Sequence, residues 1–421
     1  MSLVSTKTPI FDDIPSIQFF NGRLLSGEDM TTEQAWNAAR RKLLGQALGS
    51  GVAFGLEVRV SVKSEHAGKP IVSVDPGLAL NADGAILSLA EPTDVSLAQI
   101  DETVPVPAEF AACQPTQYSA YVKSDGVYLL TLCPAMGTQG RAPVMGLANQ
   151  EARCNRKYRR EGVQFRLHQL KLIEAELADR NKLRNLVAYK CFNSDAWQAF
   201  VTDPFAAPDT KPKLLDGLLV PKLEASEVPL ATIFWTTDGG IEYVDMWAVR
   251  RRITKPSVSE SWSFVVGDRR RSEAEAMFLQ FQAQIADLVQ SGGDLGAVAA
   301  RSHFRYLPAV GMIPVLEESD ATDAMATKFF KDMTYRSPAF INAARLETLL
   351  RQSMDYPPID TQGGEMVWLY RVRENRWAID TATGSARPRS YLVFASGHVP
   401  YQADAQFDLA RWNYSNYAIN R

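Results

Sequence analysis

Hydrophobic and polar positions near the N-terminus predict a helix that begins at Ser26 and ends before Gly49. Ser26 and Asp29 have the spacing of a capping box, and acidic residues early in the helix with basic residues late complement the helix dipole. Small apolar residues recur at helical spacing, which predicts a face packed closely against a sheet. That face consists of Ala35, Ala39, Leu43 and Ala47, with Leu44 and Leu48 beside it. The Val-rich residues 52–62 predict a strand after the helix.

Three β-hairpins are predicted in the stretch that follows. Each pairs strand-forming residues around a turn that contains Asp-Gly. The hairpins span 76–89, 118–132 and 228–249, with turns at 82–84, 124–126 and 237–240. Apolar residues at helical spacing predict a helix over 164–185, between the second and third hairpins.

The pattern changes after residue 265. Apolar residues at 274, 277 or 278, 281, 285 and 288 form a seam with a spacing near 3.5 residues. Two interpretations stay open: the seam joins copies in an oligomer, or it packs a helix on its own chain. Beyond it we predict a loop, a helix and two strands, at 305–315, Pro338 to Met354, 365–372 and 391–396.

These elements predict a multidomain α+β fold. We expect residues 1–55 to form an N-terminal arm and helix. Residues 56–265 form a β-rich domain with hairpins and a partly helical insert at about 140–225. Residues 266–421 form a mixed α+β C-terminal domain.

The composition is that of an ordinary globular protein. The 421-residue chain has a net charge of -3, with 46% hydrophobic and 22% charged residues, so it lacks the basic excess typical of nucleic-acid binders. The four cysteines are widely spaced and predict free thiols rather than a zinc site or a disulfide framework. We see no signal peptide and no membrane-spanning stretch, and therefore expect synthesis in the cytoplasm.

The sequence contains no motif for a known catalytic or phosphate-binding site. The four histidines are isolated from one another, and no pair has the spacing of metal ligands. We therefore expect no enzyme activity, cofactor or metal. Basic clusters, among them Arg250, Arg251 and Arg252, have two interpretations: they bind phosphates or an acidic protein surface, or they form solvated faces and ion pairs between subunits.

Several stretches resemble proteins encoded beside phage-tail-like contractile injection systems. The N-terminal ones are FFNGRLL at 19–25, ED at 28–29, ARRKLL at 39–44, GVAFGLEV at 51–58 and PGLALNADG at 76–84. The later ones are VPLATIFW at 228–235, VDMWAVRRR at 244–252, RYLPAVGMIPV at 305–315, VWLYRVREN at 367–375 and FDLARWNYSNYA at 407–418. In outline the N-terminal module is also similar to the start of the type VI secretion baseplate adaptor, although SGEDM replaces that family's PQHF-like helix start.

The resemblance implies a non-enzymatic structural subunit at the baseplate or tail periphery, which binds other subunits of the particle and forms a homo-oligomer, a trimer by analogy. Contact with a membrane or envelope would be indirect, and the particle's final location stays open: cytoplasmic, envelope-anchored or released. The alternative is a tail-tip or fibre-like protein that recognises a glycan or membrane protein of a cell envelope. The resemblance also implies that residues 1–55 are a docking module, and the candidate docking residues are Phe19, Phe20, Leu24, Leu25, Trp412, Tyr414 and Tyr417. Large apolar side chains are usually buried within their own chain, so core packing is the competing interpretation of these residues.

Overall fold

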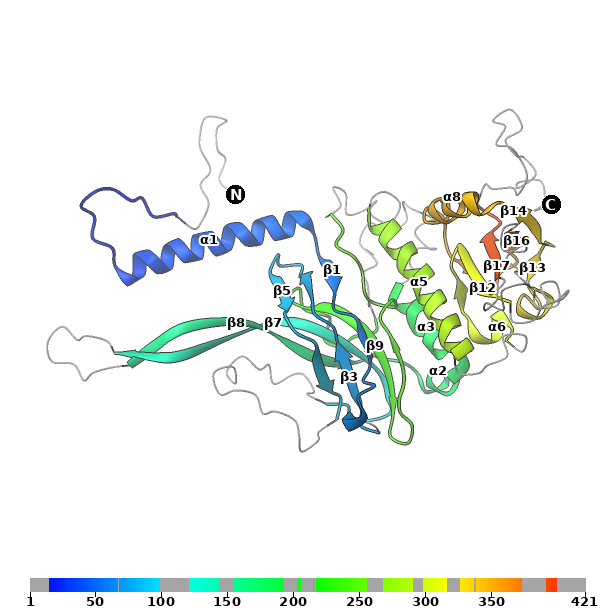
Figure 1. Cartoon of the computed structure of the whole chain (residues 1–421), viewed down its shortest axis with the longest axis horizontal. Coiled ribbons are helices and arrows are strands. Elements are labelled where there is room, and N and C mark those ends of the chain that lie inside the picture. Colours follow the sequence, from blue (N-terminus) through cyan, green and yellow to red (C-terminus); the bar gives the residue numbers. More distant parts are fainter. Residues whose placement is uncertain are drawn as a thin grey trace, which may run out of the picture.

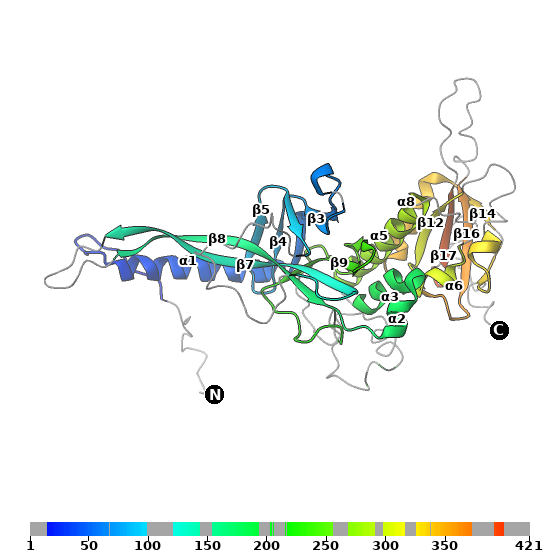
Figure 2. The same ribbon diagram turned by 90° about the horizontal axis from the view of Figure 1, so that it is seen from below.

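The computed structural model describes residues 15–66, 68–98, 121–143, 154–192, 203, 205, 215, 217–255, 268–290, 298–315, 326–336, 338–372 and 391–399. Within these ranges the chain is an elongated multidomain α+β protein, which confirms the predicted fold class. A β-rich region lies in the middle, an α/β region lies at one end, and a helix and a β-hairpin extend from the other end (Figure 1 and Figure 2).

The β-rich region is built on a four-stranded antiparallel sheet of order β10-β9-β7-β8. Its strands are β7 (Gly126–Pro143), β8 (Cys154–Gln169), β9 (Val228–Thr236) and β10 (Gly240–Asp245). The predicted hairpin with a turn at 237–240 is confirmed as β9–β10. β7 pairs with β9 only as far as Leu132, whereas its ladder with β8 continues to Pro143.

Two small sheets cover one face of this sheet. Their orders are β1-β4-β5 and β2-β3-β6, and a short 3-10 helix, η1 (Ser64–His66), lies between β2 and β3. The strands are β1 (Gly51–Gly55), β2 (Val58–Val60), β3 (Ile71–Val74), β4 (Gly77–Leu80), β5 (Ile86–Leu89) and β6 (Thr93–Ser96). The predicted hairpin at 76–89 is confirmed as β4–β5. The strand expected over 52–62 is two strands, because Gly55 and Leu56 have φ values of 61° and 55°, which turn the chain between β1 and β2.

Side chains along β7 point alternately to the two faces of the central sheet and belong to two separate cores. Tyr128, Leu130 and Leu132 pack with the small sheets, while Val127 and Leu129 pack on the opposite face with helices. The helices are α2 (Glu174–Ala178), α3 (Arg180–Phe192) and α5 (Asp268–Gln290). Each face of the sheet is therefore buried by a different layer.

The C-terminal region is a sheet of order β12-β17-β16-β13, with β14 also paired to β16. Its strands are β12 (Val310–Pro314), β13 (Thr334–Tyr335), β14 (Ala339–Ile341), β16 (Met366–Val372) and β17 (Tyr391–Ser396). A two-stranded ladder of β11 (Tyr306–Leu307) with β15 (Ile359–Asp360) and two helices, α6 (Ala300–His303) and α8 (Ala343–Ser353), accompany it. Phe281 and Ile285 of α5 pack on one face of the sheet and Leu349 of α8 packs on the other.

Helix α5 joins the two regions through its buried side chains. Ala276 and Met277 belong to the core shared with α3, and Phe281 and Ile285 belong to the C-terminal core. These contacts favour the second interpretation of the seam at 274–288, a helix packed on its own chain. The part of the seam near Leu288 is only partly buried.

Four predictions of local structure are wrong in part. Residues 164–169 are strand rather than helix, because Leu167 pairs across the sheet with Leu130. Tyr121–Asp125 form no strand, so the hairpin expected over 118–132 is absent from its described part. Residues 305–315 are two short strands, not a loop, and 339–341 are strand β14, so the helix expected from Pro338 begins at Ala343. In all of these except 121–125, a partner strand distant in sequence overrides the local pattern.

Candidate docking surface

Helix α1 (Gly27–Leu48) begins at the predicted capping box. The Ser26 hydroxyl accepts the Asp29 N–H at 3.1 Å, and the Ser26 N–H donates to Asp29 Oδ2 at 2.8 Å. The Ser26 N–H, with help from its hydroxyl and from Arg23, holds the pKa of Asp29 below its usual value of 3.8. The helix ends at Gly49, whose φ of 97° is in the left-handed range that favours glycine.

Replacing Ser26 with alanine is expected to fray the start of α1. Loss of an N-cap hydroxyl costs about 1 kcal/mol, and this cost falls on local opening because no residue in the first turns of α1 is buried. Hydrogen exchange at the amides of residues 28–31 should become about fivefold faster, while the global unfolding midpoint stays the same. Thr31→Ala is the matched control, because it removes a hydroxyl that donates to the Gly27 carbonyl oxygen and does not cap the helix. A drop in the global midpoint would contradict this description of α1.

Most of α1 stands clear of the β-rich region (Figure 1). Gly45 is the buried residue of the helix and rests on the β4–β5 turn, where a Cβ would lie 2.2 Å from the Gly84 carbonyl oxygen. The prediction that one face packs on a sheet is wrong. Leu43, Leu44 and Leu48 are 53%, 67% and 59% exposed, because the close contact runs through the glycine on another side of the helix.

The segment before α1 folds back on the first turns of the helix. The Arg23 guanidinium donates to Asp29 Oδ1 at 2.7 Å and to the Gln18 carbonyl oxygen at 2.7 Å. This arrangement leaves the predicted docking residues Phe19, Phe20, Leu24 and Leu25 at the surface, 56%, 63%, 94% and 49% exposed. These four side chains are therefore not packed in a core, which was the competing interpretation. Their role in docking stays a prediction. Trp412, Tyr414 and Tyr417 lie outside the described residues.

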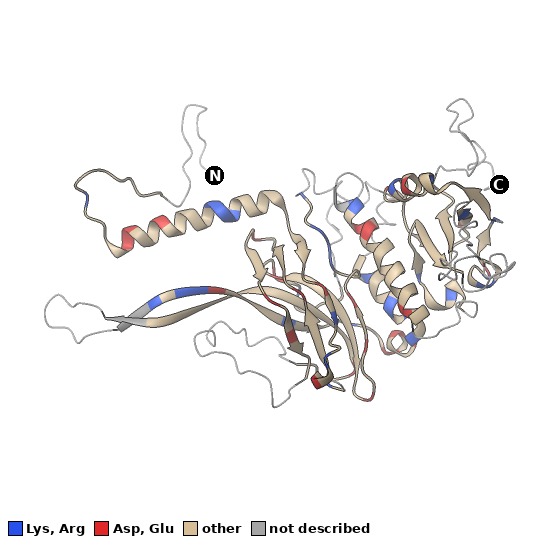
Figure 3. Ribbon diagram, in the orientation of Figure 1, with Lys and Arg blue, Asp and Glu red and all other residues tan. Residues whose placement is uncertain are grey.

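A second projection accompanies α1. Beyond Leu132 the strands β7 and β8 continue as a two-stranded ribbon, residues 133–143 and 154–164, with no third strand among the described residues. It extends toward the same end of the molecule as the start of α1 (Figure 1 and Figure 2). Lys157, Tyr158, Arg159 and Arg160 on β8 are exposed and give the ribbon a basic stretch (Figure 3). We call residues 19–48 and this ribbon the docking end.

The three consecutive arginines after β10 contact their own chain. Arg250 donates to the carbonyl oxygens of Gly55 and Leu56 at 2.5 and 2.8 Å and so holds the kink between β1 and β2. Arg251 donates to the Trp247 and Ala248 carbonyls, and Arg252 forms an ion pair with Glu275 at 3.3 Å. The structure therefore gives Arg250 and Arg251 an internal role that the sequence analysis missed. Binding of a partner by Arg252, which is 55% exposed, stays a prediction.

A buried charge cluster lies on the central sheet. Glu227 accepts from Thr131, His168 and Arg166, each at 2.7 Å, and its side chain is 0% exposed. Burial alone would raise the pKa of Glu227, but its hydrogen bonds to His168 and Thr131 and the nearby charges bring that pKa below 4.5. Sequence analysis did not reveal this cluster, because Glu227 lies 59 to 96 residues from the three side chains that it contacts.

A second polar cluster ties the β-rich region to the C-terminal region. Asp245 of β10 accepts from Arg184 Nε of α3 at 2.8 Å and from Gln280 Nε2 of α5 at 3.0 Å. Gln280 in turn accepts from the Tyr306 hydroxyl at 3.0 Å. The contacts join β10, α3, α5 and β11, four elements that also share an apolar core, so this cluster is a structural joint.

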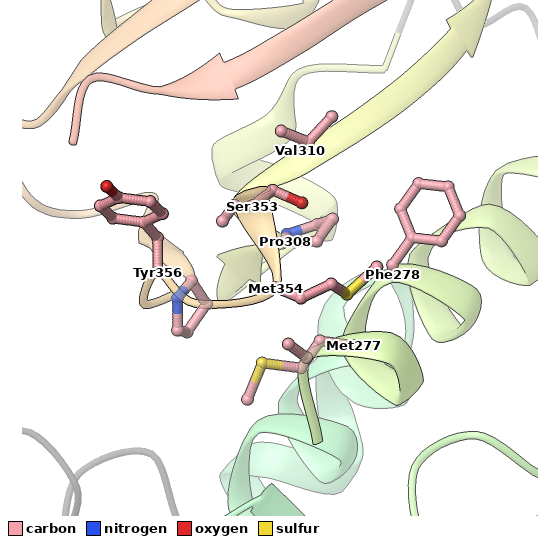
Figure 4. A pocket seen from close by; sticks show the side chains of 10 residues that line it. Met277, Phe278, Pro308, Val310, Ser353, Met354 and Tyr356 are labelled. Carbon is pink, nitrogen blue, oxygen red and sulfur yellow. The ribbon is translucent and has the colours of Figure 1, made fainter. Parts of the chain in front are cut away.

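A small crevice lies between α5 and the end of α8 (Figure 4). Its volume of about 10 Å³ is enough for one water molecule. It is lined by Met277, Phe278, Pro308, Met354 and Tyr356, among others. Among the described residues no three His, Cys, Asp or Glu side chains gather where they could hold a metal ion. The described thiols of Cys133 and Cys191 are unpaired, and burial raises their pKa values to about 11 and about 12.

No helix in the described ranges combines the length and apolar character needed to cross a bilayer. No protein-family model matches the chain, and no curated protein matches it. Among solved structures the chain has a distant likeness to a baseplate complex of the type VI secretion system, with a TM-score of 0.26, 11% identity, and coverage of 83% of this chain and 84% of that one. The TssK-TssF-TssG baseplate subcomplex of the same system gives a TM-score of 0.24, 11% identity and 83% coverage of each chain. Values this low assign neither a family nor a function to the chain.

Proposed function

We propose that the protein is a non-enzymatic assembly subunit of a baseplate-like structure in a contractile injection system or related phage-tail-like particle, and that it binds other subunits through its docking end. The observation that supports this most is the concentration of exposed large apolar side chains on α1 and the segment before it. Clusters of exposed large apolar side chains are typical of protein interfaces.

Both projections need support that the described residues do not supply. An isolated helix is marginally stable in water, because most helix stability in proteins comes from packing of an apolar face. A two-stranded ribbon is also marginal without a third strand or a covering layer. Contacts with another protein would supply the missing burial for both.

The charges of the ribbon indicate the kind of surface it meets. Lys157, Arg159 and Arg160 are exposed along one stretch of β8, beside a single acidic residue, Glu161. Cations grouped in this way favour an acidic partner surface, and they also discourage unwanted pairing of a free strand edge. A protein partner is favoured because the chain as a whole is slightly acidic.

Co-expression with the products of the neighbouring genes tests the proposal. We expect a stoichiometric complex whose Kd rises at least about tenfold in the variant K157E/R159E/R160E, since each exposed pair contributes up to about 1 kcal/mol. The matched control K328E/K331E changes exposed lysines of the C-terminal region and should leave the complex unchanged. A chain that joins none of these proteins and instead binds cell-envelope material would contradict the proposal and favour the tail-tip alternative.

A further inference from the structure

We infer that α1 pairs with the α1 of a second copy of the chain in an antiparallel, two-fold arrangement. The inference rests on the proposed function in one respect, because it names the partner of the helical part of the docking end. It rests on three observations: which face of α1 is uncovered, where its charges lie, and where its exposed apolar residues lie.

The uncovered face follows from the spacing of residues in a helix. At 100° per residue, Met30, Asn37, Arg41, Leu44 and Leu48 fall on one stripe, and all five are exposed. They are separated by seven, four, three and four residues, the spacing of a helix that meets another helix along its length. Gly45, the residue by which α1 rests on the β4–β5 turn, lies to one side of this stripe. A partner helix therefore has access to the stripe.

The charges of α1 are segregated along its length. Glu28, Asp29 and Glu33 occupy the first half, and Arg40, Arg41 and Lys42 occupy the second. An antiparallel partner with the same sequence would place acidic residues opposite basic ones at both ends of the contact. A parallel partner would place like charges together, which is unfavourable. The charge pattern of α1 is therefore complementary to that of a second α1 that runs in the opposite direction.

The exposed leucines, like the charges, form one group at each end of α1. Leu24 and Leu25 lie just before α1, while Leu44 and Leu48 lie near its end, and all four are exposed. In an antiparallel pair that crosses near Trp36, the first pair of leucines from one copy lies beside the second pair from the other. Both apolar clusters are then covered at once, and an isologous interface of this type closes as a dimer.

Sedimentation velocity on the purified full-length chain tests the inference. We expect a concentration-dependent dimer whose Kd rises at least about tenfold in R40E/R41E and in E28K/E33K, because each reversal sets like charges opposite one another. Mixing these two variants should restore the dimer, since one helix is then mainly acidic and the other mainly basic. Leu44→Glu should remain monomeric, and circular dichroism should show that all variants stay folded, because the altered residues are outside the core.

Two outcomes would overturn the inference: a wild-type chain that stays monomeric at its highest soluble concentration, or an oligomer that both charge reversals leave intact. Either can be told apart from a failure of the proposed function. A monomer that still joins the neighbouring gene products through the ribbon would refute only the pairing of α1, whereas a dimer that joins none of them would refute only the proposed function.

Discussion

Glu227→Ala is expected to lower the free energy of unfolding by about 3–5 kcal/mol, because it leaves buried charge without its partner. Glu227 is enclosed by Arg166, His168 and Thr131, and its carboxylate accepts a hydrogen bond from each. After truncation the Arg166 guanidinium still contacts Glu224 at 3.0 Å, but that carboxylate is 46% exposed and cannot replace a fully buried partner. Urea unfolding followed by tryptophan fluorescence measures the loss.

Glu224→Ala is the matched control, because it removes the other carboxylate that Arg166 contacts, at 3.0 Å, from a partly exposed position. Its expected cost is below about 1 kcal/mol. If both variants lost the same small amount, the buried cluster would not have the stabilising role assigned to it.

The same site predicts a pH dependence. The pKa of Glu227 in the folded protein lies below 4.5, so its contribution to stability is present above pH 4.5 and is lost as the pH falls through the folded pKa. Wild-type protein should lose this contribution in acid. Glu227→Gln, which cannot titrate, should show a flatter stability profile below pH 4.5.

Asp245→Ala is expected to cost a similar amount, about 3–5 kcal/mol, and to weaken the joint between the two regions. Asp245 is 1% exposed and holds Arg184 of α3 and Gln280 of α5. Asp245 contacts both helices, and α5 also packs on the C-terminal sheet. Without Asp245 the two regions should therefore unfold in separate thermal transitions. Differential scanning calorimetry would show two peaks where the wild type shows one.

Asp287→Ala supplies the control for that experiment. Asp287 also pairs with Arg184, at 2.5 Å, but it is 60% exposed. Its removal should cost less than about 1 kcal/mol and leave one transition. A single, slightly shifted peak for Asp245→Ala would mean that the apolar core alone couples the regions.

Features encoded by adjacent residues could be predicted from the sequence. The capping box at Ser26, the Asp-Gly turn of β4–β5 and the turn between β9 and β10 each need only a few neighbouring residues, and each is confirmed. Their physical cause is local: a hydroxyl that reaches a nearby amide, or a glycine that permits a tight turn. The Asp-Gly at 125–126 is followed by β7 but preceded by no strand within Tyr121–Asp125, so this local signal is not sufficient by itself.

Features that depend on distant partners were not predictable. Leu167 and Leu170 have helical spacing with later leucines, yet Leu167 is in a strand because β7 offers it a partner in Leu130. The apolar residues of α1 suggested burial, but a hydrophobic pattern cannot say whether its own chain or another chain covers it. Glu227 and His168 are separated by 59 residues, so the sequence contains no local sign that they meet.

Hydrogen exchange of the chain, free and in complex with its neighbouring gene products, tests the central claim most directly. At a concentration where the free chain is monomeric, we predict new protection of backbone amides at 27–48 in α1 or at 133–143 and 154–164 in the ribbon. Protection confined to the C-terminal sheet, with the docking end exchanging as fast as in the free chain, would contradict the claim.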